Sequence, residues 1–234
     1  MNVHKTFFQK SPWTWKEMIK LLLLVLVVVP IFIEHLLKGY LSDLLHNNLY
    51  SGTLTGLIMA VLFMSGLYLL AIRPNHLSWS EVGLRRFPTY YWRAIVGWTV
   101  VLIGVSIAML VLMEMLLGVG SDNSKTDSLQ SRMTLLHFLI GFVSAAIISP
   151  LYEEIFYRGF LYRFIRSKYG ILAGLLCSSF IFMIVHIPTF NTLPITFVSG
   201  LVFAWTYEKS GSIIPAMIIH GSFNGIAIIL TALG

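Results

Sequence analysis

Residues 21–29 read LLLLVLVVV (Leu21 to Val29), an unbroken aliphatic run that is too apolar for the surface of a soluble protein. The run lies within an apolar segment, 18–38, that is long enough to cross a bilayer, because the hydrocarbon core requires about 20 apolar residues in a helix. Pro30 follows the run directly and lies inside the expected span. A cleaved signal peptide is the alternative, but the charged leader is long and no A-x-A-like cleavage site follows the run. The run therefore predicts a retained transmembrane helix.

The composition extends this prediction to the whole chain. Of the 234 residues, 57% are hydrophobic and 11% are charged, whereas a soluble domain carries about 25% charged residues. Seven segments are apolar enough to be spans: 18–38, 53–72, 94–117, 135–157, 170–187, 193–207 and 213–233. We expect an all-α fold, a polytopic transmembrane helix bundle of about seven spans, with residues 1–234 forming a single integral membrane domain. Segment 118–134 is the most polar stretch and is expected to be an exposed loop.

Lysine and arginine are distributed unevenly between the connections. Thirteen of the 16 fall on one set of alternate connections, which includes the leader, and three fall on the other. Cytoplasmic loops carry an excess of Lys and Arg, so the asymmetry predicts a multi-pass protein of the cell membrane with a cytoplasmic N-terminus and a C-terminus outside. This orientation also accounts for the net charge of +6, and no nucleic-acid partner is expected. The single cysteine, Cys177, excludes a disulfide framework or a CxxC site, and we expect it to be a small packing residue.

Ionisable side chains inside apolar helices are costly and usually face a bundle interior, a cavity or a partner. Glu154 and Arg158 are four residues apart, so helical geometry places them on one face, where they can form a pair. Glu153 points about 100° away from Glu154. Arg158 can therefore neutralise Glu154, while Glu153 faces a cavity and is suited to taking a proton from water. The alternative is a charge cluster at a helix end, with Glu153 at the membrane interface.

Two other apolar helices carry polar residues. His186 ends the run that begins at Phe180, with Phe182 four residues before it, and His220 and Asn224 share one face of the last helix. His220 and Asn224 together offer two hydrogen-bond donors, as a developing oxyanion requires, although polar residues also join helices in membrane bundles. At a rise of 1.5 Å per residue, Glu153, His186 and Asn224 lie roughly 20, 24 and 18 Å from the same end of the bundle. This similar depth predicts one buried polar cluster.

Three motifs in this order resemble the CAAX prenyl protease and bacteriocin-processing family, also called the Abi family. EEIFYR (Glu153 to Arg158) matches E-E-x-x-x-R, FMIVH (Phe182 to His186) matches F-x-x-x-H, and HGSFN (His220 to Asn224) matches H-x-x-x-N. The resemblance covers about residues 94–233, the expected catalytic core, whereas residues 1–93 contribute two spans and an interfacial segment and carry no motif.

The resemblance implies an intramembrane endopeptidase of the glutamate type. Glu153 and His186 would bind and activate the attacking water, and His220 and Asn224 would stabilise the oxyanion. The supporting residues would be Glu154, Arg158 and Phe182. The implied partners are the lipid bilayer and a peptide or protein substrate near or within the membrane, and prokaryotic members of the family are linked to bacteriocin maturation and self-immunity.

No cofactor is expected, although zinc is the alternative, because Glu153, His186 and His220 could form a His2Glu set. We favour the metal-free site, since Asn224 beside His220 suits oxyanion binding better. Two other functions compete with proteolysis. One is a non-catalytic bacteriocin-immunity or peptide-binding membrane protein of the same fold, and the other is a proton-coupled transporter, which the absence of an internal repeat disfavours. Glu34 and His35 receive no role.

Overall fold

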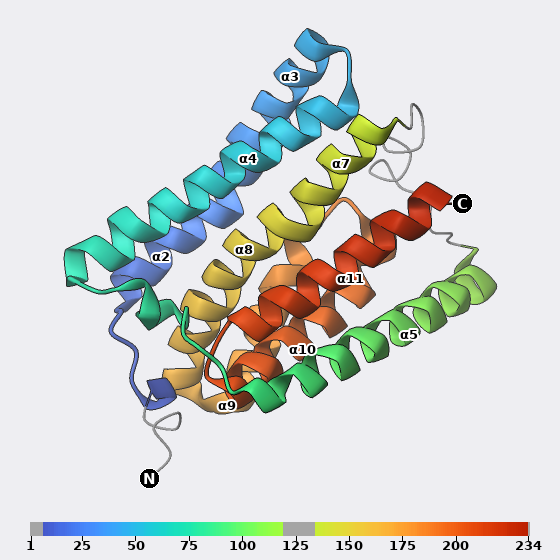
Figure 1. Ribbon diagram of the computed structural model, residues 1–234. Helices are drawn as coiled ribbons and strands as arrows, with labels where there is room; N and C mark the ends of the chain where they lie inside the picture. The colour runs from blue at the N-terminus through green and yellow to red at the C-terminus, as the bar shows by residue number, and fades with distance from the viewer. Residues whose placement is uncertain (1–6, 119–133, 234) are drawn as a thin grey trace.

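The computed structural model describes residues 7–118 and 134–233, and in these residues every regular element is a helix (Figure 1). Several long helices contain segments with π-helical hydrogen bonding, labelled η1, η2, η6 and η7. The bounds of the long elements are α2 (Trp15–Leu23), η1 (Leu24–Leu37), α3 (Lys38–Leu45), α4 (Asn48–Leu67), η2 (Tyr68–Ile72), α5 (Trp92–Leu117), α7 (Leu135–Val143), η6 (Ser144–Ile148), α8 (Ser149–Glu154), η7 (Ile155–Tyr162), α9 (Arg163–Ile184), α10 (Leu193–Ser210) and α11 (Ile214–Leu233). The predicted all-α transmembrane bundle is confirmed.

The first two spans form a helical hairpin along one side of the bundle (Figure 1). The first helix begins at Trp15, where Thr14 and Glu17 form a capping box, and continues without a break to Leu45. It is thus longer than the predicted 18–38, because its polar last turns stay helical until His46 adopts a left-handed conformation. Pro30 lies within η1, whose wider turns accommodate a residue that cannot donate a backbone hydrogen bond.

The segment Leu135–Ile184 is one helical run of 50 residues that contains two legs. Its direction changes at Gly170, whose φ of 88° and ψ of 176° are not helical. The second leg returns along the first, since a Cβ on Gly174 would lie 2.9 Å from the ring of Tyr162. The predicted segments 135–157 and 170–187 correspond to these legs, although the first leg continues beyond 157 to the turn at Gly170.

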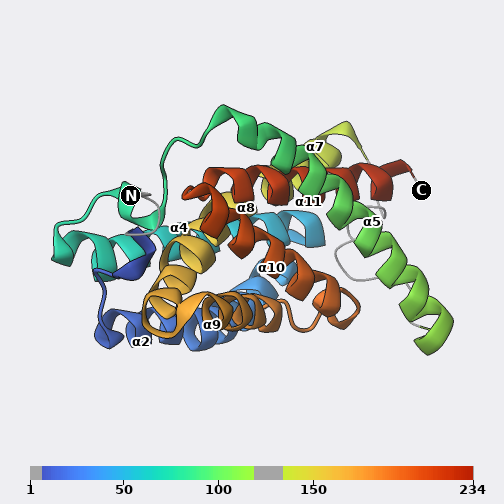
Figure 2. The same ribbon diagram turned by 90° about the horizontal axis from the view of Figure 1, so that it is seen from below.

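Within residues 7–118 and 134–233, five helical runs are long and apolar enough to cross a membrane: Trp15–Leu45, Asn48–Asn75, Thr89–Leu116, Leu135–Ile184 and Ile214–Leu233. Counting the two legs of Leu135–Ile184 separately and adding α10 gives the seven legs of the bundle. Nine of the 18 residues of α10 are buried, where this helix packs against α9 and α11. Helix α5 packs through Ile95, Thr99, Leu102 and Ser106 and then diverges from the bundle, as seen in Figure 2.

The segment that precedes α2 is fixed to the end of the bundle where α2 begins. Phe8 is buried against the rings of Tyr162 and Tyr207, and the guanidinium of Arg166 donates to the Phe8 carbonyl. Arg163 donates to the Lys10 carbonyl and forms an ion pair of 2.8 Å with Glu81. The predicted loop 118–134 falls almost entirely outside the described residues.

Candidate active site

The ion pair between Glu154 and Arg158 is the centre of the buried polar cluster. Glu154 ends α8 and Arg158 lies in η7, and neither side chain has any exposed surface. Arg158 Nη1 donates to Glu154 Oε1 over 3.0 Å, and Arg158 Nη2 donates to the carbonyl oxygen of Gly200 over 3.2 Å. The predicted pair is therefore confirmed. Two fully buried charges need such compensation, because each would otherwise carry a large desolvation cost.

His220 joins this pair to Glu153. Its Nδ1 lies 2.9 Å from Glu154 Oε1, and its Nε2 lies 3.8 Å from Glu153 Oε2. An ionised carboxylate only accepts hydrogen bonds, so Nδ1 carries the proton that is donated to Glu154. The imidazole is thereby oriented with Nε2 toward Glu153, whose side chain is 14% exposed. The carboxylates of Glu154 and Glu153 thus lie next to the two nitrogens of one imidazole ring. The angle between these residues around the helix did not by itself predict this arrangement.

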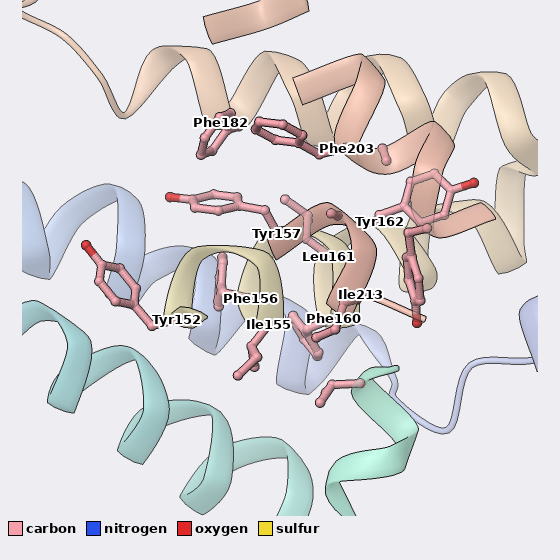
Figure 3. Close-up of a cluster of buried hydrophobic side chains, with 14 of the residues drawn as sticks. Tyr152, Ile155, Phe156, Tyr157, Phe160, Leu161, Tyr162, Phe182, Phe203 and Ile213 are labelled. Atoms are coloured by element: carbon pink, nitrogen blue, oxygen red, sulfur yellow. The ribbon is translucent and has the colours of Figure 1, made fainter. Parts of the chain in front are cut away.

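Aromatic rings enclose the charged groups. The ring of Phe203 stacks on His220 at 4.7 Å between centroids, and Phe182 meets His220 edge-on at 5.9 Å. The guanidinium of Arg158 lies 4.3 Å from the centroid of Phe182 and 5.1 Å from that of Phe203. Figure 3, a view of the neighbouring buried hydrophobic side chains, shows Phe182 and Phe203 side by side with Tyr157 facing them. Cation–π contacts stabilise the guanidinium, and the low dielectric constant among the surrounding rings strengthens the electrostatic interactions of the charged groups.

His186 lies just beyond the end of α9, and its ring contacts Phe182, the phenylalanine that also meets His220. Its ring meets Phe182 at 4.8 Å, and its Nδ1 lies 2.7 Å from the Phe182 carbonyl oxygen. A carbonyl oxygen can only accept, so Nδ1 is the protonated nitrogen and Nε2 carries the lone pair in the neutral ring. The sequence prediction that Phe182 packs against His186 is confirmed, and the ring of Phe182 contacts both His186 and His220.

Asn224 contacts the π-helical segment η6. Asn224 Nδ2 donates to the carbonyl oxygen of Ala145 over 2.9 Å. In η6 the backbone N–H of Ser149 donates to the carbonyl of Ser144, five residues back. The next residue, Pro150, has no N–H to give to Ala145, so the amide of Asn224 takes its place. Only the second N–H of this amide can then serve an oxyanion.

Some functional neighbours carried no sequence signal. Phe203 is one apolar residue among many in its helix, and Gly200 contributes only its carbonyl oxygen. The small pair Ser199 and Gly200 was the one available hint of a close approach at this point. The expectation for Cys177 was wrong, because its side chain is exposed on the outer face of α9 rather than packed.

Metal ligands are not gathered in the part of the chain that the structure describes. In residues 7–118 and 134–233, no group of three His, Cys, Asp or Glu side chains is close enough to hold a metal ion. The Glu153, His186 and His220 set proposed from the sequence therefore does not have ligand geometry in this arrangement.

Comparison with known proteins agrees with the motifs. Residues 135–226 match the family model described as Rce1-like, type II CAAX prenyl endopeptidase. The UPF0177 protein YxdF of Lactococcus lactis subsp. lactis (strain IL1403) is 29% identical over 113 residues, which are 47% of this chain and 59% of that protein. The alignment thus spans less than two thirds of the curated relative. No solved structure matches the chain. The resemblance to CAAX-type membrane endopeptidases is confirmed for this range, which contains every motif position.

Proposed function

We propose that this protein is an intramembrane endopeptidase that hydrolyses a peptide bond of a membrane-associated peptide or protein. The observation that carries the proposal is the buried line Arg158–Glu154–His220–Glu153, in which successive polar groups lie 3.0, 2.9 and 3.8 Å apart within apolar helices. Such groups are expensive in a membrane interior and mark functional sites. The family match supports the same reaction class for residues 135–226.

In this proposal Glu153 is the general base. It takes a proton from a water molecule that is also bound by Nε2 of His186, and the resulting hydroxide attacks the carbonyl carbon of the substrate. The proton then passes from Glu153 to the leaving amine as the C–N bond breaks. Glu154 and Arg158 do not touch the substrate, and they hold His220 in place.

The oxyanion of the tetrahedral intermediate would receive hydrogen bonds from two donors. These are Nε2–H of a protonated His220 and the second N–H of Asn224, which lie four residues apart on α11. The Ala145 contact fixes the orientation of the Asn224 amide before substrate binds. Pre-oriented donors of this kind lower the barrier because they need no rearrangement during the reaction.

The proposed membrane and orientation rest on the distribution of charged residues along the chain rather than on the candidate active site. We propose a multi-pass protein of the cell membrane with its N-terminal end in the cytoplasm, from the distribution of Lys and Arg. Bacteriocin maturation or self-immunity is a prediction from the family resemblance, and it places the substrate among small membrane-associated peptides.

The test uses the purified protein in liposomes with a library of membrane-associated peptides, and mass spectrometry identifies cleaved bonds. Glu153→Gln should abolish cleavage while leaving the protein folded, because glutamine keeps the shape but cannot take the proton. His186→Ala should also abolish it. Cys177→Ala is a matched control on the exposed face of α9 and should cleave at the wild-type rate. Full turnover by Glu153→Gln would exclude the mechanism, and full biological protection by the same variant would favour the non-catalytic immunity function.

A further inference from the structure

Three serine hydroxyl groups are buried between α9, α10 and η7 without a protein partner. Ser178 and Ser179 have 0% exposed surface and Ser199 has 4%. Among the described residues, none donates to or accepts from the Oγ atoms of these serines. We call Ser178, Ser179 and Ser199 the serine seam.

The seam lies where three helices meet. On α9, Gly174 packs against Tyr162 and Phe182 packs against Tyr157, so Ser178, midway between them, faces the same η7 leg. Ser179 faces α10, because a Cβ on Gly200 would lie 2.9 Å from Ser179 Cβ and 3.1 Å from Ser179 Oγ. Ser199 precedes Gly200 on α10.

The seam adjoins Arg158. The carbonyl of Gly200, opposite Ser179, accepts from Arg158 Nη2. Two further buried atoms of the ion pair, Arg158 Nε and Glu154 Oε2, also lack a partner among the described residues. Buried polar atoms without a partner are thus present both in the serine seam and in the ion pair that holds His220.

Buried hydroxyl groups without a hydrogen bond are unfavourable, and proteins satisfy them with ordered water when several polar atoms face one place. A hydroxyl can both donate and accept, so three of them with the Arg158 Nε–H offer the two to four partners that a buried water needs. We propose that the serine seam is a water-binding site. Resting on the proposed function, we further infer that it supplies the hydrolytic reaction.

Supply matters because each hydrolysed bond consumes one water molecule, and the surrounding helices are apolar. Water held in the seam would reach Glu153 along Arg158, Glu154 and His220, which form one polar line.

Radiolytic footprinting tests the water site directly, because hydroxyl radicals formed from bound water oxidise the adjacent side chains. The experiment uses the full chain in liposomes and compares wild type with the double variant Ser179→Ala/Ser199→Ala. Phe182 and Phe203 should be oxidised in the wild type and several-fold less in the variant. Ser51→Ala is the control, since Ser51 is equally buried but lies on α4 and bonds to Ser42 and Asn48.

Unchanged oxidation of Phe182 and Phe203 in the double variant would overturn the water site. A higher midpoint of thermal unfolding would also overturn it, because removal of dry, unsatisfied hydroxyls stabilises a protein. For the supply role, we expect a several-fold lower kcat with unchanged KM, and an unchanged kcat would overturn that role alone. If the wild type cleaves nothing, the proposed function fails, whereas the footprint still decides the water site.

Discussion

Replacing Asn224 with alanine should reveal a structural role that is distinct from catalysis. The Asn224 Nδ2 group donates to the carbonyl oxygen of Ala145. Pro150 cannot donate to this oxygen, because proline has no backbone N–H. Alanine leaves this carbonyl without that donor in a lipid environment that offers no substitute. A buried acceptor left unsatisfied costs about 1–3 kcal/mol.

This cost can be measured as a shift in thermal unfolding. For a soluble protein of similar size, 1 kcal/mol lowers the midpoint by about 2–4 °C, so Asn224→Ala should lower it by roughly 2–12 °C. The assay is unfolding of the purified protein in mild detergent, followed by circular dichroism. Turnover of a cleaved peptide is measured on the same samples.

The variant Pro150→Ala separates the two roles. Alanine at this position supplies an N–H that can donate to Ala145 in the π-helical register of η6. The gain in midpoint from Pro150→Ala should therefore be larger in the Asn224→Ala background than in the wild type, as a double-mutant cycle would show. Activity should not recover, and loss of an oxyanion donor lowers kcat by about 10²–10³-fold.

Three results would refute parts of this reasoning. An unchanged midpoint for Asn224→Ala would mean that the hydrogen bond to Ala145 does not contribute to stability. Equal effects of Pro150→Ala in both backgrounds would mean that the proline and the asparagine do not share the same carbonyl. Recovery of turnover in the double variant would show that Asn224 acts on the structure and not on the oxyanion.

Two further predictions concern the helices beside the site. Arg158→Met should destabilise the fold by about 3–5 kcal/mol, because Glu154 would remain as an uncompensated buried charge, and adding Glu154→Gln should recover most of this loss in the unfolding midpoint. A double variant as unstable as the sum of its singles would contradict the pairing. Gly159→Ala should cost about 1–3 kcal/mol, since its Cβ would lie 2.8 Å from Val82 Cβ. Gly97→Ala, inside α5, meets open space and should instead stabilise the helix by about 0.5–1 kcal/mol, and equal midpoints for both variants would contradict the close contact.

Periodicity and hydropathy were sufficient to predict the bundle and two contacts of the site, the Glu154–Arg158 pair and the packing of Phe182 against His186. The spacing of Glu154 and Arg158 predicted their pair because a helix places residues four apart on one face. The π-helical segments could not be predicted, since their register depends on how Pro30 and Pro150 are accommodated in the packed bundle. For the same reason the Asn224–Ala145 contact was not foreseen.

Contacts between helices were the other feature that could not be predicted from the sequence. Phe203 gave no polar signal, and only packing of α10 against α11 places its ring on His220. The position of Glu153 beside the same imidazole depends on the angle between α8 and α11, which sequence spacing does not contain. The roles of these residues in catalysis remain predictions that the variants above examine.

The anchoring of residues 7–10 has a consequence for biosynthesis. Phe8 and Lys10 are held by Arg166 and Arg163, which follow them by more than 150 residues in the chain. At 5–20 residues per second, a ribosome needs roughly 8–30 s to make that intervening length. The first helix must therefore wait in the membrane with its preceding segment undocked, and this end of the protein closes late in assembly. A fusion partner placed before Phe8 would interfere at that closing step rather than at insertion.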